Sequence, residues 1–103
     1  MAPRRLAEYE IYLPMRYNNG GKIPRRLVDQ TCLEVLRRFG GYTLKKNVEG
    51  RITYSGRDRL NVLSVHTYET LSNDRWFRRF KAVLAQRFRQ REIYITKKRL
   101  TVL

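Results

Sequence analysis

Few residues in this chain could do chemistry on their own, apart from its arginines. There is one histidine, His66, and one cysteine, Cys32, and the nine acidic residues are scattered along the chain. A metal site needs three or four histidine, cysteine or carboxylate ligands gathered in one place. Gly20 and Gly21 stand before Lys22 without the GxxxxGK(S/T) spacing of a phosphate-binding loop. We therefore expect no catalytic set, no metal and no cofactor.

His66 supports one alternative, which is a small nuclease. An imidazole changes its charge near neutral pH, so a histidine on a strand could act as the general base of an RNA-cleaving protein. A lone histidine on a strand more often has a structural role or lies exposed to solvent. The nuclease is therefore the third of three functional hypotheses.

Arginine dominates the composition. The formal net charge is +14, from 23 Lys and Arg against 9 Asp and Glu, and arginine outnumbers lysine 17 to 6. Such an excess repels itself in a compact domain unless a polyanion neutralises it. Arginine contacts phosphate through two parallel hydrogen bonds and also stacks on bases. The composition therefore favours nucleic acid, RNA or DNA, as the partner, ahead of an acidic protein or an anionic membrane surface.

No segment of the sequence is typical of targeting or of membrane insertion. The basic residues at the start are not followed by the apolar segment of a signal peptide. No apolar run approaches the roughly 18 residues that span a bilayer. Cys32 has no second cysteine with which to form an internal disulfide, which fits a reducing compartment. We expect a cytoplasmic protein that does not enter a membrane.

Residues 72–91 combine basic and apolar side chains at a helical spacing. The stretch holds seven Lys and Arg residues and one acidic residue, Asp74. Its apolar residues recur at intervals of three and four, which places them on one face of a helix. They are Trp76, Phe77, Phe80, Val83, Leu84 and Phe88. We expect Asn73 to cap this helix and the apolar side to pack against the core, with most of the arginines facing outward.

Alternation of apolar and polar residues predicts four extended segments. They are residues 6–13, 42–54, 60–68 and 92–97, with residues 100–103 as an additional edge strand. Residues 56–59 have the composition of a hairpin turn between the second and third segments. In the first segment Tyr9, Ile11 and Leu13 share one side, and in the third Leu63 and Val65 do.

A first helix is expected between the first two extended segments. Pro24 fits its first turn, an apolar stripe follows, and Gly40 supplies the left-handed residue that ends it. The order β-α-β-β-α-β then fills residues 1–103 as one domain. Two βαβ halves of this kind most simply form an α+β, ferredoxin-like sandwich. It has a four-stranded antiparallel sheet, with both helices on one face and the first and third strands in the centre.

The expected binding surface is the outer face of the two helices. Because both helices pack on the same side of the sheet, their arginines should form a continuous positive surface. The helical residues predicted to contact phosphates are Arg26, Arg37, Arg75, Arg78, Arg79 and Arg89. Basic residues expected in loops extend this surface, and they are Lys45, Lys46, Arg57 and Arg59. Such an array should bind nucleic acid without catalysis and with a steep dependence on salt, alone or as a subunit of a nucleoprotein complex.

The open face of the sheet is the alternative binding site. Tyr12 and Tyr94 could form a base-stacking platform there, as aromatic residues do in the RNA-recognition motif. Glu8, Glu10 and Glu92 are expected on the same face, where they would repel phosphates. The face could instead mediate self-association. This gives the second functional hypothesis, a structural or adaptor subunit that forms a homodimer through its sheet and docks an acidic protein.

Four short segments, spread over most of the chain, form a recognisable set. They are Tyr12-Leu13-Pro14, Asn19-Gly20, Phe39-Gly40-Gly41-Tyr42-Thr43 and Arg87-Phe88-Arg89-Gln90-Arg91-Glu92-Ile93. Together they resemble a group of uncharacterised bacterial proteins of about this length, which share an FGG-(Y/L)-T motif. The resemblance implies a compact ferredoxin-like domain and transfers no catalytic residue. Many members are more acidic and carry a tryptophan soon after the glycine that matches Gly50, where this chain has Arg51 and Ile52.

Overall fold

The computed structural model describes residues 5–52 and 56–103, with the side chains of residues 50–58 left out of the description. Two helices and four strands alternate along the chain in the predicted order. Their bounds are β1 Leu6–Pro14, α1 Arg25–Phe39, β2 Thr43–Ile52, β3 Gly56–Tyr68, α2 Leu71–Arg87 and β4 Ile95–Arg99. In the described part of the chain, no helix is long and apolar enough to cross a bilayer.

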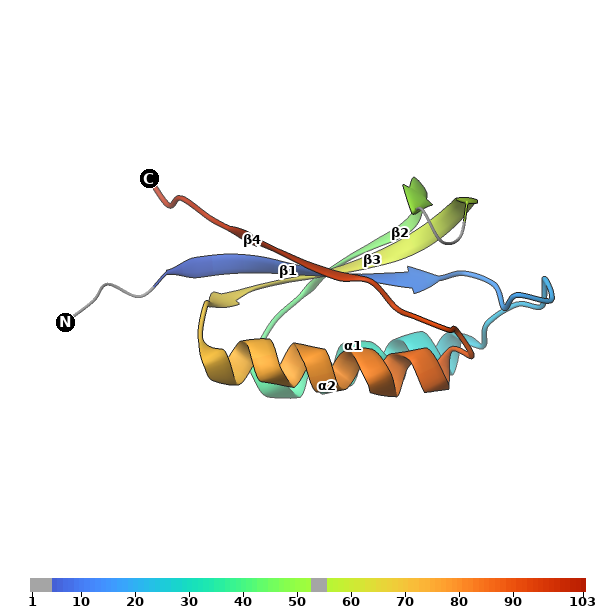
Figure 1. Ribbon diagram of the computed structural model, residues 1–103, viewed down its shortest axis with the longest axis horizontal. Coiled ribbons are helices and arrows are strands. Elements are labelled where there is room, and N and C mark those ends of the chain that lie inside the picture. The colour runs from blue at the N-terminus through green and yellow to red at the C-terminus, as the bar shows by residue number, and fades with distance from the viewer. Residues whose placement is uncertain (1–4, 53–55) are drawn as a thin grey trace.

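The four strands form one antiparallel sheet, and both helices cover the same face of it (Figure 1). The strand order is β2-β3-β1-β4, so β1 and β3 are central, as predicted. This is the ferredoxin-like α+β arrangement expected from the element order. The two helices lie side by side beneath the sheet, and the opposite face carries no helix (Figure 1).

The core begins with the alternation along the two central strands. Tyr9, Ile11 and Leu13 of β1 are all buried, and so are Leu63 and Val65 of β3. The register pairs Ile11 with Leu63 and Tyr9 with Val65, which brings the two apolar rows onto the same face. A shift of one residue in either strand would turn its apolar row toward the opposite face, so the register is strongly specified.

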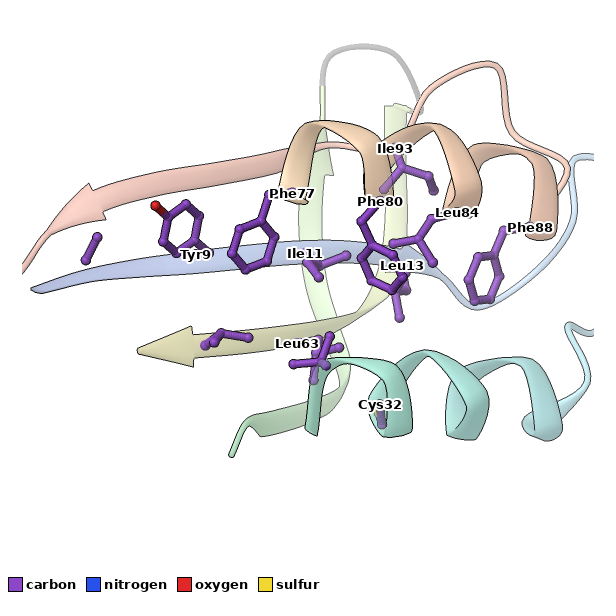
Figure 2. Close-up of a cluster of buried hydrophobic side chains, with 13 residues drawn as sticks. Tyr9, Ile11, Leu13, Cys32, Leu63, Phe77, Phe80, Leu84, Phe88 and Ile93 are labelled. Carbon is purple, nitrogen blue, oxygen red and sulfur yellow. The ribbon is translucent and has the colours of Figure 1, made fainter. Parts of the chain in front are cut away.

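Helix α2 supplies much of the aromatic part of the core. Phe77, Phe80, Leu84 and Phe88 are buried against β1 and β3 (Figure 2). The predicted apolar face is wider than the buried surface, however. Val83 is 46% exposed, because it lies on the flank of the helix rather than over the sheet. Trp76 is half-buried for the same reason.

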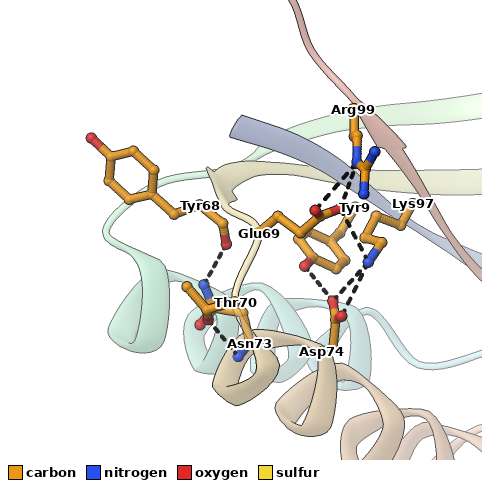
Figure 3. Close-up of polar contacts among 8 residues, drawn as sticks. All are labelled: Tyr9, Tyr68, Glu69, Thr70, Asn73, Asp74, Lys97 and Arg99. Atoms are coloured by element: carbon orange, nitrogen blue, oxygen red, sulfur yellow. Dashed lines mark hydrogen bonds and ion pairs between the residues drawn. The ribbon is translucent and has the colours of Figure 1, made fainter. Parts of the chain in front are cut away.

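The local sequence explains in part where α1 ends and where α2 begins. Gly40 has a φ of 82° and its N–H donates to the carbonyl of Leu36, as expected for a left-handed cap. At the start of α2 the predicted cap is wrong. The N-cap is Thr70, whose hydroxyl accepts the backbone N–H of Asn73 at 3.0 Å (Figure 3). Asn73 lies inside the first turn, and its side chain donates to the carbonyl of Tyr68.

Three predicted strand ends are also corrected. Residues 56–59 belong to β3 rather than to a turn, because Gly56 already pairs with Ile52. The last strand begins at Ile95 rather than at residue 92. Arg89, with a φ of 53°, turns the chain back after α2, and Ile93 packs into the core before pairing begins. Beyond β4 the N–H of Leu100 still bonds to the carbonyl of Leu6 in β1, and residues 101–103 form no strand with the part of the chain that the structure describes.

Candidate nucleic-acid interface

Four arginines occupy the outer face of the helical layer. Arg26 and Arg37 project from α1, and Arg75 and Arg79 project from α2, and all four are exposed. None of the four forms an ion pair with a carboxylate that the structure describes. The two helices thus present an exposed positive surface, which we call the helical face and define by these four arginines.

The carboxylates nearest to the helical face are already paired with other cations. Asp29 pairs with Arg25 one turn away, at 3.8 Å. Glu34 accepts two hydrogen bonds from Arg87, at 2.7 and 3.0 Å. Because these acids are neutralised locally, they leave the positive charge of the helical face intact.

Arg87 does not pair with the acidic residue that is nearest to it along the chain. It falls within the apolar sector of α2, and Glu92 is the nearest acidic residue along the chain. In the structure Glu92 binds Lys81 at 3.0 Å, and Arg87 reaches across to α1, where it also donates to the hydroxyl of Thr31 at 2.9 Å. Arg87 thus joins the two helices.

A groove runs between the two helices on the helical face. It is open to solvent and has a volume of about 640 Å³. Its lining consists of Glu34, Arg37 and Arg38 from α1 and of Trp76, Arg79, Phe80 and Val83 from α2. Arginines from both helices therefore meet the aromatic rings of α2 here.

Trp76 is the largest ring in the groove, and its surroundings hold it in place. Its ring lies 4.5 Å from that of Phe80, and it meets Phe39 and Phe77 edge to face at 5.0 and 5.1 Å. Phe39 and Phe77 are themselves stacked. Sequence periodicity predicted that Trp76 packs in the core. Part of its ring does so, and another part lines the groove.

Arg38 is a groove residue that the sequence reasoning missed. Its guanidinium donates to Ser72 Oγ at 3.2 Å and to Asn73 Oδ1 at 3.3 Å, and it lies 5.6 Å from the centre of the Phe39 ring. These contacts fix its position at the junction between the end of α1 and the start of α2. The pair Arg37-Arg38 at the end of the predicted helix was the available signal, since adjacent residues on a helix point in different directions.

Two of the predicted contact residues lie away from the helical face. Arg78 lines a smaller hollow of about 260 Å³ on the other flank of α2, beside Tyr9, Asp74 and Lys97. Arg89 follows the end of α2, and its guanidinium lies 5.1 Å from the centre of the Tyr17 ring. Arg78 and Arg89 therefore lie apart from the four arginines of the helical face. A rotation of about 100° per residue turns Arg78 away from Arg79.

A network of polar contacts joins β1, β4 and the start of α2 (Figure 3). Tyr9 donates its hydroxyl hydrogen to Asp74 Oδ1 at 2.6 Å, and Lys97 donates to Asp74 Oδ2 at 3.0 Å. These hydrogen bonds, with that of Tyr9 first, hold the pKa of Asp74 below its usual range. Burial, and then the bond to Asp74, raise the pKa of Tyr9, so its phenol stays protonated. The network ties β4 to α2 and offers no nucleophile.

Lys97 also joins this network to the end of β3. It lies 3.3 Å from Glu69, which in turn accepts from Arg99 at 3.2 Å (Figure 3). Lys97 and Arg99 therefore stand on the helical side of β4, with their charges paired. They are unlike the arginines of the helical face in this respect.

His66 lies on the open face of the sheet, where it pairs with β1. Its Nε2 is 2.6 Å from Glu8 Oε2, and Lys98 reaches the other oxygen of Glu8 at 3.3 Å. The hydrogen bond from His66 is the main cause that lowers the pKa of Glu8. The arrangement links three neighbouring strands, β3, β1 and β4. The nuclease hypothesis stays a prediction.

Tyr12 and Tyr94 are brought together on the open face, as the stacking alternative requires. The N–H of Tyr12 donates to the carbonyl of Tyr94 at 3.1 Å, and both side chains are half-buried. Glu8 lies on this face, with its ion pairs to His66 and Lys98, and Glu10 shares the face two residues along β1. Glu92 was predicted to lie there as well, but its bond to Lys81 places it beside α2.

The basic residues predicted in loops lie instead on strands. Lys45 and Lys46 belong to β2 and are exposed, and Lys45 pairs with Val62 on the open face. Arg59 of β3 is exposed and donates to the carbonyl of Asn47 at 3.1 Å. Arg57 also belongs to β3, and its side chain lies outside the described residues. Lys45 is therefore separated from the helical face by the sheet.

Cys32 faces the core, as predicted, and burial raises the pKa of its thiol. Among the residues that the structure describes, no three histidine, cysteine or carboxylate side chains come close enough together to hold a metal ion. Comparisons of the chain with protein-family models, with curated proteins and with solved structures found no match.

Proposed function

We propose that this chain is a non-enzymatic nucleic-acid-binding protein whose helical face contacts the phosphates of RNA or DNA. The observation that carries the proposal is the set of four exposed arginines, Arg26, Arg37, Arg75 and Arg79, without acidic partners in the described structure. Exposed arginines next to acidic residues would form their own ion pairs. Here the neighbouring acids are taken by Arg25 and Arg87, so the helical face remains available to an external anion.

Phosphate is the anion that suits this surface best. A guanidinium binds it through two parallel hydrogen bonds, and several such contacts along one strand release condensed counterions. The four arginines are distributed over both helices, which matches an extended polyanion better than a single small anion. The buried, unpaired Cys32 fits a reducing cytoplasm, where RNA and DNA are the abundant polyanions.

Charge reversal on the helical face tests the proposal. The double variant R75E/R79E should weaken binding of a labelled oligonucleotide at least about 50-fold at low salt, because it removes two phosphate contacts and adds two repulsions. The control K45E/K98E makes the same change in net charge on the open face and should weaken binding only a few-fold. Fluorescence anisotropy of the labelled oligonucleotide measures both.

Equal losses for the two variants would show that only net charge matters, and a larger loss for K45E/K98E would move the site to the sheet. An acidic protein is the alternative occupant of the helical face. Competition with polyglutamate distinguishes the two, because a nucleic-acid site should keep its oligonucleotide when the charge concentrations are equal. Displacement at equal charge would favour the adaptor hypothesis.

A further inference from the structure

The groove between α1 and α2 combines a nonpolar floor with arginine walls. The floor is formed by Trp76, Phe80 and Val83. The half-exposed Trp76 and the 46% exposed Val83 are costly to leave in water on a surface that is otherwise strongly cationic. An occupant that covers them must offer a flat apolar surface and negative charge together.

We propose that this groove takes an unpaired base of a single-stranded nucleic acid, which stacks on Trp76 while its flanking phosphates contact Arg37, Arg38 and Arg79. The inference rests on the proposed function and narrows its substrate to single strands. A base offers a flat π surface for the indole, and a phosphate on either side of it offers the charge. Arg26 and Arg75 then lie outside the groove, where they reach the next phosphates of the strand.

The arginines that line the groove are available to bind an anion. Arg37 and Arg79 form no ion pair with any described carboxylate, and Arg38 is held in place by Ser72 and Asn73. Glu34 is the one acidic residue in the lining, and its two bonds from Arg87 neutralise it. The lining as a whole is therefore cationic, despite its carboxylate.

Size and shape favour a single strand over a duplex. A volume of about 640 Å³ admits a nucleotide, whereas a duplex is far too wide to enter a groove between two packed helices. In a duplex each base is also stacked and paired, so it has no free surface for Trp76. A duplex could reach only the outer arginines and should bind by charge alone.

Trp76 itself reports on the groove, because it is the only tryptophan in the chain. A single-stranded oligonucleotide should quench its fluorescence strongly, in parallel with binding measured by anisotropy. A blunt duplex of the same sequence should bind with little quenching. A free mononucleotide at the same base concentration should also quench little, since it lacks the additional phosphates. Equal quenching by duplex and strand, or by mononucleotide and strand, would overturn the inference.

Matched variants separate the groove from its surroundings. V83E should place a charge in the groove and weaken strand binding about 10- to 100-fold, which is the loss of one stacked base and its phosphate contacts. The control A82E makes the same charge change at the next exposed position of α2, outside the groove, and should cost only a few-fold. R79A and R75A form a second pair, one turn apart, and only R79A should reduce the preference for strand over duplex.

The variants also distinguish this inference from the function on which it rests. If the wild-type protein binds neither strand nor duplex, the proposed function fails and the inference with it. If both bind equally, and V83E behaves as A82E does, the protein binds nucleic acid but the groove is not its base site. W76F keeps a ring in the aromatic cluster and should weaken strand binding several-fold without changing duplex binding, so a misfolded variant cannot imitate the expected result.

Discussion

Arg87 forms its ion pair with a residue that is distant in the sequence, Glu34 of α1. Its position in the apolar sector of α2 follows from the spacing of the helix. Its contacts with Glu34 and Thr31 arise because α1 packs alongside, 53 to 56 residues away in the chain. The pair is largely removed from water, since the Arg87 side chain is only 11% exposed.

A double-mutant cycle tests this partnership. The coupling between R87M and E34Q in the free energy of unfolding should be about 1 to 2 kcal/mol, because each single change leaves a partly buried charge without its partner. The coupling between R87M and E92Q should be close to zero, because Glu92 binds Lys81. Urea unfolding measures all of these variants. A larger coupling with Glu92 would contradict the observed pairing.

Asp74 gives the protein a predictable response to acid. The hydrogen bonds from Tyr9 and Lys97 lower its pKa in the folded state below its ordinary value of 3.8. The carboxylate therefore adds stability above pH 4, and this contribution is lost as the pH falls through the folded-state pKa. D74N should be less stable than the wild type at pH 7, and the difference should shrink as the pH approaches 3.

Urea unfolding at pH 7, 5 and 3 follows the Asp74 effect. E10Q is the control, since Glu10 has no ion pair within the described residues, and it should alter stability by a similar small amount throughout. A difference between D74N and the wild type that stays constant down to pH 3 would show that Asp74 acts only through packing.

At the scale of elements, the start of α2 is capped by the hydroxyl of Thr70, which has an extended backbone, and not by the predicted Asn73. Thr70 has a φ of −135°, which is the conformation that a capping residue adopts, whereas Asn73 is already helical. Three residues near the start of this helix have side chains that can cap a helix, and they are Thr70, Ser72 and Asn73. The end of β3 decides among them, because Asn73 donates to the carbonyl of Tyr68 and so fixes the approach of the chain.

The variant T70A should lower the free energy of unfolding by about 1 kcal/mol, since it leaves the N–H of Asn73 without its acceptor. T70S keeps the oxygen and should stay within a few tenths of a kcal/mol of the wild type. Thermal or urea unfolding followed by circular dichroism measures both. A neutral T70A would indicate that Asn73 caps the helix after all.

At the scale of the whole molecule, the fold separates the basic residues into groups with different neighbours. The helical face holds arginines without acidic partners, the edge beside β4 holds Lys97 and Arg99 in ion pairs, and the open face mixes Lys98 with His66 and Glu8. The formal charge of +14 is therefore not uniformly available. A polyanion should be drawn to the helical layer in preference to the sheet.

The salt dependence of binding should reflect this separation. With four to five arginine contacts to a single strand, raising the salt from about 50 to 200 mM should weaken binding roughly 50- to 130-fold. R75E/R79E should flatten the dependence as well as weaken binding, and K45E/K98E should leave the slope nearly unchanged. Anisotropy titrations at several salt concentrations give the slopes. An unchanged slope in R75E/R79E would remove these two arginines from the interface.

Local sequence patterns were sufficient to predict the architecture of this protein. The alternation of Tyr9, Ile11 and Leu13, and of Leu63 and Val65, indicated which sides of the central strands are buried, and Gly40 marked the end of α1. The order of the six elements then left few ways to pair the strands, since two βαβ halves favour one topology. The basic excess and its concentration in residues 72–91 could be read in the same way.

Contacts between distant segments could not be read from such patterns. The groove exists only because α1 and α2 pack side by side, so Arg38 and Trp76 became neighbours through the tertiary structure, as did Arg87 and Glu34. Periodicity indicates the direction in which a side chain leaves its helix, but not how far the neighbouring element covers it, which is why Val83 and Trp76 are more exposed than predicted. The sequence thus determined the fold and the positive charge of residues 72–91. The packing of the two helices decided which arginines remain unpaired and which aromatic ring lies among them.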